Sequence, residues 1–116
     1  MVEESYNIDY EVKKILNQDN EEPIILLANN QIPTRFEKVA LIPYKKSLYT
    51  ILSPIDTFPG IKKDDTLVLK IIRNDENLLD LNLPNDSKII GKIQKLYKKG
   101  EKILNLDAFK KEEFVF

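Results

Sequence analysis

Five lysines near the end of the chain have the spacing of a single helix face. A helix turns by about 100° per residue, which places all five in one narrow sector: Lys88, Lys92, Lys95, Lys99 and Lys102. Ammonium groups in such a row could neutralise the phosphates of a nucleic acid or rest on an anionic membrane. The lysine-rich helix at residues 87–102 is therefore a candidate anion or nucleic-acid contact.

A solvated helix face is the alternative explanation of these lysines, and the composition favours it. Nucleic-acid-binding modules usually add arginines for bidentate contacts and exposed aromatic rings for stacking. Arg35 and Arg73 are the only arginines, and no Trp or Phe lies on the lysine face. Membrane binding is disfavoured further, because the apolar side of the same helix is needed for the core. We expect weak nucleic-acid association at most.

Clustered carboxylates are the second group with possible chemistry. The acidic pairs at 64–65 and 75–76, together with Asp80, could bind a hard cation, but none has the spacing and glycine of a calcium loop. We interpret them as turn residues. The chain has no histidine and no cysteine, which excludes Ser-His-Asp or Cys-His catalysis and metals held by these ligands. The sequence predicts no enzymatic activity, metal, cofactor or small-molecule substrate.

Three phenylalanines in the C-terminal tail form another candidate contact: Phe109, Phe114 and Phe116. They are the one apolar cluster outside the predicted regular structure, so they could dock into the groove of a protein partner. Packing back onto the chain's own sheet is the favoured alternative.

The composition is that of one soluble globular domain. The chain has 116 residues, of which 42% are hydrophobic and 32% charged, enough for a single core. No apolar run approaches the roughly 20 residues that span a bilayer, and the acidic start differs from a signal peptide. We expect a cytoplasmic location. Residues 1–22 are strongly acidic and residues 88–111 strongly basic, so charge is unevenly distributed along the chain.

The elements that position these residues follow from apolar periodicity and turn signals. An amphipathic pattern after Asn7 predicts a helix at 8–18. Five short apolar runs between 23 and 83 predict an antiparallel meander of four to five strands, because the connections are too short for parallel crossovers. A second helix is predicted at 87–99, between a cap at Asp86 or Ser87 and a stop at Gly100. The tail at 101–116 completes a single α+β domain at 1–116.

The predicted strands carry large apolar side chains on both faces. PIILLA at 23–28 suits a strand buried on both faces, and LVLKII at 67–72 places Leu69 on one side and Val68 on the other. Between 34 and 44, one set of residues shares a face: Phe36, Ala40, Ile42 and Tyr44, with Val39 and Leu41 opposite. The turn that follows is predicted at 45–47.

The second helix can cover only one of these faces, because its apolar stripe spans about one third of its circumference. Leaving three or four aliphatic side chains in water on the other face would forgo about 1.5–3 kcal/mol each. The second face therefore needs its own cover. The N-terminal helix, the tail and a second copy of the chain, which would form a homodimer, are the candidates, and the helix is favoured.

Residues 22–99 resemble the YrzB-like family of small bacterial proteins. The resemblance depends on the order of elements, the aromatic hairpin with Tyr44, Tyr49 and Pro54, and the acidic pair at 64–65 before an apolar strand. It implies a small cytoplasmic α+β protein and assigns no catalytic residues. This chain departs from the family pattern in its basic segments and in its two terminal extensions.

The sequence is most consistent with a non-enzymatic protein-interaction or accessory module whose partner is another protein or a second copy. Missing catalytic constellations and apolar termini favour this hypothesis. Weak nucleic-acid association through the lysine-rich helix is the alternative.

Overall fold

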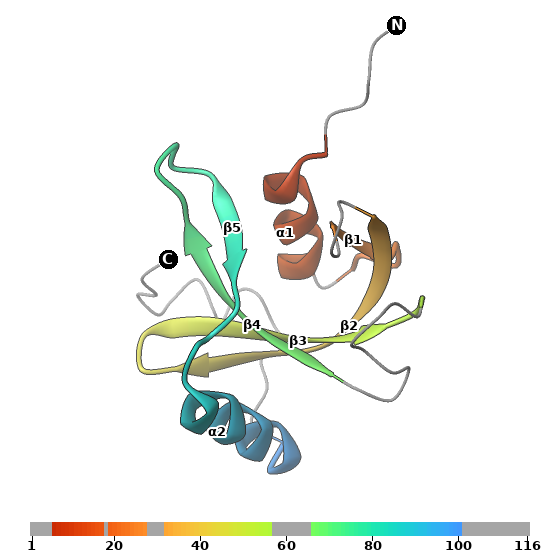
Figure 1. Ribbon diagram of the computed structural model, residues 1–116. Helices are drawn as coiled ribbons and strands as arrows, with labels where there is room; N and C mark the ends of the chain where they lie inside the picture. The colour runs from red at the N-terminus through yellow and green to blue at the C-terminus, as the bar shows by residue number, and fades with distance from the viewer. Residues whose placement is uncertain (1–5, 18, 28–31, 57–65, 101–116) are drawn as a thin grey trace, which may run out of the picture.

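One antiparallel sheet and two helices make up the described part of the protein. The computed structural model describes residues 6–17, 19–27, 32–56 and 66–100. Its elements are α1 (Ile8–Leu16), β1 (Ile24–Leu27), β2 (Pro33–Tyr44), β3 (Ser47–Pro54), β4 (Leu67–Arg73), β5 (Leu79–Asn82) and α2 (Ser87–Lys98). The strands pair antiparallel in chain order, so the predicted α+β fold with a β-meander is confirmed (Figure 1). The predicted tail at 101–116 lies outside the described residues.

Local signals in the sequence determine where both helices begin. The side chain of Asn7 caps α1 by accepting a hydrogen bond from the backbone N–H of Tyr10. Asp86 caps α2 through the N–H of Lys88, at 2.9 Å. After α2, Gly100 has a φ of +80°, a conformation that glycine adopts freely and that ends helices. Neither described helix is long and apolar enough to cross a membrane.

The two helices pack on different faces of the sheet and create two cores (Figure 1). The first core, between α1 and the sheet, contains Val12, Ile15, Ile24, Phe36, Leu41, Leu48, Leu52, Leu69, Ile71 and Leu79. The second core, between α2 and the sheet, contains Ala40, Ile42, Tyr49, Ile51, Val68 and Ile93. Along β4, Val68 lies in the second core whereas its neighbours Leu67 and Leu69 belong to the first, because side chains on a strand point to opposite faces in turn. The sheet face that α2 does not cover is thus covered by α1.

A β-bulge in β2 overturns part of the predicted face assignment. The register between β2 and β3 shifts between Lys38 and Ala40, which leaves Val39 as an extra residue on β2. An extra residue reverses the alternation, so Phe36 lies in the first core whereas Ala40 and Ile42 lie in the second. The prediction that Phe36 shares their face is wrong for this reason. Val39, predicted to point away from Ala40, packs against the second core too.

The turn between β2 and β3 consists of Lys45 and Lys46 alone. Tyr44 pairs directly with Ser47, so Ser47, predicted in the turn, is the first residue of β3. Both lysines have positive φ values, +50° and +64°, as in a two-residue type I′ turn. That turn prefers Asn-Gly, and the left-handed conformation is strained for lysine.

Strand β1 corrects the prediction that PIILLA is buried on both faces. Ile24 is buried in the first core, and Leu26 packs against it. Ile25 and Leu27 are only half-buried and belong to neither of the two described cores. The reason is position, because β1 is an edge of the sheet and α2 lies against β2 and β4.

Side chains of α1 bond to the backbones of both edge strands. Glu11 Oε1 accepts a hydrogen bond from the N–H of Ile25 in β1 at 2.7 Å. Asp9 Oδ1 accepts one from the N–H of Leu79 in β5 at 2.8 Å. In Figure 1 the curled sheet places β5 and β1 on either side of α1. The helix therefore closes the open side of the sheet and satisfies edge groups that would otherwise attract another strand.

Two aspartates that bond to strands of the sheet, Asp9 to β5 and Asp56 to β2, should make the fold sensitive to acid. Lys13 and the N–H of Leu79 lower the pKa of Asp9, and hydrogen bonds from the side chain and backbone of Arg35 lower that of Asp56. A carboxylate whose pKa is lowered in the folded state stabilises the fold at pH values above its unfolded pKa of about 3.9. This stabilisation is lost as the pH falls below that value.

We expect Asp9→Asn and Asp56→Asn to lose less stability than the parent on acidification, because an asparagine oxygen still accepts the backbone N–H but does not titrate. Urea midpoints measured from about pH 5 down to about pH 2.5 test this, across the interval below the reference value. Equal losses in the parent and both variants would show that these carboxylates do not cause the acid sensitivity.

Candidate functional site

The predicted lysine row lies on the exposed side of α2. Lys88, Lys92, Lys95 and Lys99 are all exposed. Lys99 is the C-cap of the helix, so the row runs from the first turn of α2 to its end. Lys102, the fifth member, lies outside the described residues. The structure thus confirms that four of the five lysines share one accessible helix side.

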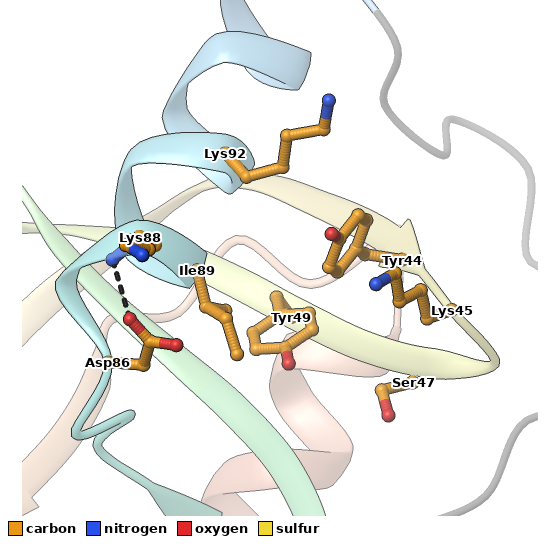
Figure 2. A pocket seen from close by; sticks show the side chains of 8 residues that line it. All are labelled: Tyr44, Lys45, Ser47, Tyr49, Asp86, Lys88, Ile89 and Lys92. Carbon is orange, nitrogen blue, oxygen red and sulfur yellow. Dashed lines mark hydrogen bonds between the residues drawn. The ribbon is translucent and has the colours of Figure 1, made fainter.

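The start of the lysine row borders a hollow of about 480 Å³ between α2 and the β2–β3 turn. We call it the tyrosine hollow. Its lining comes from two segments far apart in the sequence: Tyr44, Lys45, Ser47, Tyr49, Asp86, Lys88, Ile89 and Lys92. Figure 2 shows Tyr44 with Lys92 on one side and Lys45 on the other, and Ile89 projecting from α2 towards Tyr49. The packing of α2 against the sheet therefore brings lysines and aromatic rings together.

The two tyrosines form a wall of the hollow. Their ring centroids are 6.4 Å apart and the ring planes are inclined by 58°. Tyr49 is only 5% exposed, and burial, with the neighbouring Tyr44, raises its pKa above the usual value. Tyr44 is half-buried, so part of its ring remains accessible. Tyr49 is a neutral structural support, and Tyr44 is the ring that a ligand can reach.

Positive charge dominates the hollow. Lys45, Lys88 and Lys92 line it together with a single carboxylate, that of Asp86. This carboxylate is already engaged as the cap of α2, shown by the dashed line in Figure 2. The ammonium nitrogen of Lys45 lies 5.3 Å from the ring centroid of Tyr44, within the range of a cation–π contact. The hollow is suited to an anionic ligand that also offers a flat apolar surface.

The predicted turn carboxylates are not gathered into one site. Asp80, predicted as a turn residue, instead lies in β5 and accepts a hydrogen bond from the N–H of Leu81 at 2.7 Å. Asp75 and Glu76 are exposed between β4 and β5. The acidic pair at 64–65 lies outside the described residues, as do Phe109, Phe114 and Phe116. In the described part of the chain, no group of three carboxylates is placed to hold a metal ion.

Sequence reasoning missed Tyr44, Lys45 and Tyr49 as members of the lysine site. It predicted a lysine face without Trp or Phe, which is correct for α2 itself. The aromatic rings instead come from the hairpin. The signal was the position of Tyr44 two residues after Ile42, which places both side chains on one face of the strand. Nothing in the sequence showed which helix covers that face.

Comparison with models of protein families, with curated proteins and with solved structures gave no match for this chain. The resemblance of residues 22–99 to the YrzB-like family therefore stays a prediction.

Proposed function

We propose that this protein is a non-enzymatic accessory protein that binds an anionic partner through a basic surface. This basic surface consists of Lys45, Lys88, Lys92, Lys95 and Lys99. One observation carries the proposal: the four described lysines of the row form no ion pair with a carboxylate of a described residue. A row of uncompensated ammonium groups attracts anions and speeds their association.

The lysines of α1 provide a contrast within the same molecule. Lys13 pairs with Asp9 and Lys14 with Glu11, both at 2.9 Å. Lys14 also donates to the carbonyl of Pro23 at 2.8 Å. These lysines act within the fold, whereas the lysines of the basic surface are available to a partner.

The coverage of both sheet faces by helices also supports a partner site at the basic surface. A second copy of the chain was one predicted cover for the second sheet face. Because α1 and α2 each occupy a face, no partner is needed to bury either one. A partner would instead meet the molecule at exposed side chains, and the basic surface is an exposed region of concentrated charge. The phenylalanines of the tail remain a separate prediction of a protein contact.

Chromatography on immobilised heparin tests the proposal with a generic polyanion. The whole chain has a formal net charge of −1 at pH 7, so retention requires a local concentration of positive charge. We expect the parent to be retained and Lys92→Gln/Lys95→Gln to elute at clearly lower salt. Failure of the parent to bind at low salt would overturn the proposal.

A matched control separates local charge from total charge. Asn7→Asp/Asn82→Asp lowers the net charge by the same two units at exposed positions on α1 and β5. Aspartate caps a helix about as well as asparagine, so the fold should be retained. This control should elute with the parent. If it elutes as early as the lysine variant, total charge rather than the basic surface governs retention.

A further inference from the structure

We infer that the anionic partner is a single-stranded nucleic acid, with its phosphates along the lysine row and one base against Tyr44 in the tyrosine hollow. This inference depends on the proposed function, since it names the chemistry of the partner that the basic surface would bind.

The ring of Tyr44 provides a surface on which a base can stack. Every nucleobase has a flat π-face, and aromatic side chains in a basic groove hold single strands by stacking on these faces. Tyr44 is half-buried, and its ring centroid lies 6.4 Å from that of Tyr49, which is 5% exposed. A volume of about 480 Å³ falls within the usual range of about 300–1,000 Å³ for small-molecule pockets, so the hollow has room for a base.

The lysine row provides ammonium groups that can bind the phosphates. Lys88 and Lys92 border the hollow, and Lys95 and Lys99 continue the row away from it. From Lys88 to Lys99 the row extends along the helix for about 16 Å, at about 1.5 Å per residue. A strand with one base in the hollow can thus place its next phosphates along α2. The expected site is short, about four nucleotides, at the lower end for single-strand grooves.

The β2–β3 turn supports the same interpretation. Lys45 and Lys46 occupy strained positions with φ values of +50° and +64°, where Asn-Gly would be more stable. Strain of this kind is typical of functional positions. Lys45 lies over the Tyr44 ring. On binding, a base would take its place on the ring, and the ammonium group could then contact a phosphate.

The same features disfavour two other polyanions. In a duplex the bases are stacked inside the helix and cannot reach Tyr44. An acidic polypeptide can pair with the lysines but has no flat ring to fill the hollow. A single strand is the partner that uses both the charge and the ring.

Fluorescence anisotropy with a labelled 12-nucleotide single strand measures this binding. We expect binding at 50 mM salt that weakens by about 20- to 50-fold at 200 mM, as three to four phosphate contacts require. The matching duplex and polyglutamate should bind at least about tenfold more weakly than the single strand, because neither can stack on the ring.

Two variants test the ring and the turn separately. Tyr44→Leu should weaken single-strand binding about tenfold and leave polyglutamate binding unchanged, whereas Tyr44→Phe should bind like the parent. Lys45→Asn/Lys46→Gly relieves the strained turn, so this variant should unfold at higher temperature and still bind the strand more weakly. Loss of binding in this variant therefore cannot come from unfolding.

The outcomes distinguish the two levels of the proposal. If single strand and polyglutamate bind equally, or if Tyr44→Leu binds like the parent, the nucleic-acid inference is overturned and the anionic-partner function stands. If neither polyanion binds at 50 mM salt and heparin does not retain the protein, both are overturned.

Discussion

Replacement of Glu11 with alanine is expected to lower the free energy of unfolding by about 3–5 kcal/mol. Glu11 is 7% exposed. It accepts a hydrogen bond from the N–H of Ile25 at 2.7 Å and forms an ion pair with the ammonium group of Lys14 at 2.9 Å. Its removal leaves a largely buried ammonium group without its carboxylate and a strand-edge N–H without an acceptor. The total stability of a domain is about 5–15 kcal/mol, so the loss would be severe.

Urea unfolding followed by circular dichroism measures this effect, and two further variants identify its origin. Glu11→Gln keeps an oxygen for the N–H of Ile25 and should lose only about 1–2 kcal/mol. Glu11→Leu/Lys14→Met removes both charges and should be more stable than Glu11→Ala, because no buried charge is left unpaired. A loss of less than about 1 kcal/mol in Glu11→Ala would contradict the role of this pair.

Replacement of Ile93 with alanine is the second change with a large expected effect. Ile93 is fully buried and is the one buried residue of α2. It packs in the second core with Ile42, Ile51 and Val68. Truncation removes apolar burial and leaves a cavity, at an expected loss of about 2–5 kcal/mol. The same anchor holds the lysine row beside the tyrosine hollow.

Two measured properties of the Ile93→Ala variant should therefore change together. Thermal unfolding should begin at lower temperature, and heparin retention should fall although no lysine has been removed. Ile90→Ala is the matched control, since Ile90 is only partly buried at the margin of the same core. It should lose clearly less stability and retain binding. A parent-like melting temperature for Ile93→Ala would show that α2 is not anchored through this side chain.

Features that depend on short stretches of sequence were predictable. Local patterns predicted the start of α1 after Asn7, a cap of α2 at Asp86 or Ser87, the stop at Gly100 and the antiparallel meander. The alternation of Leu69 and Val68 in β4 also predicted apolar burial on both faces of the sheet. They could be predicted because few alternative structures satisfy the same local constraints, and the structure confirms them.

Features that depend on tertiary packing were not predictable. The bulge at Val39 has no local sequence marker and reversed the face of Phe36. The edge position of β1 reduced the burial of Ile25 and Leu27. No local pattern around Glu11 indicated that its carboxylate bonds to β1. The tyrosine hollow depends on which helix covers which face, so it too became visible only in three dimensions.

Coverage of the sheet connects this architecture to the proposed function. If α1 closes the open side of the sheet, the first core needs no partner, and the basic surface is available for one. If α1 were detached, a partner would be needed at the exposed first core instead. The attachment of α1 to both edge strands is thus the central structural claim.

Hydrogen exchange at the backbone amides of Ile25 and Leu79 tests that claim most directly. Both N–H groups donate to carboxylates of α1 rather than to another strand. With α1 in place, both amides should exchange at least about 100-fold more slowly than in an unstructured chain, and Glu11→Ala should speed exchange at Ile25. Exchange of both amides at the unstructured rate in the parent protein would contradict closure of the sheet by α1.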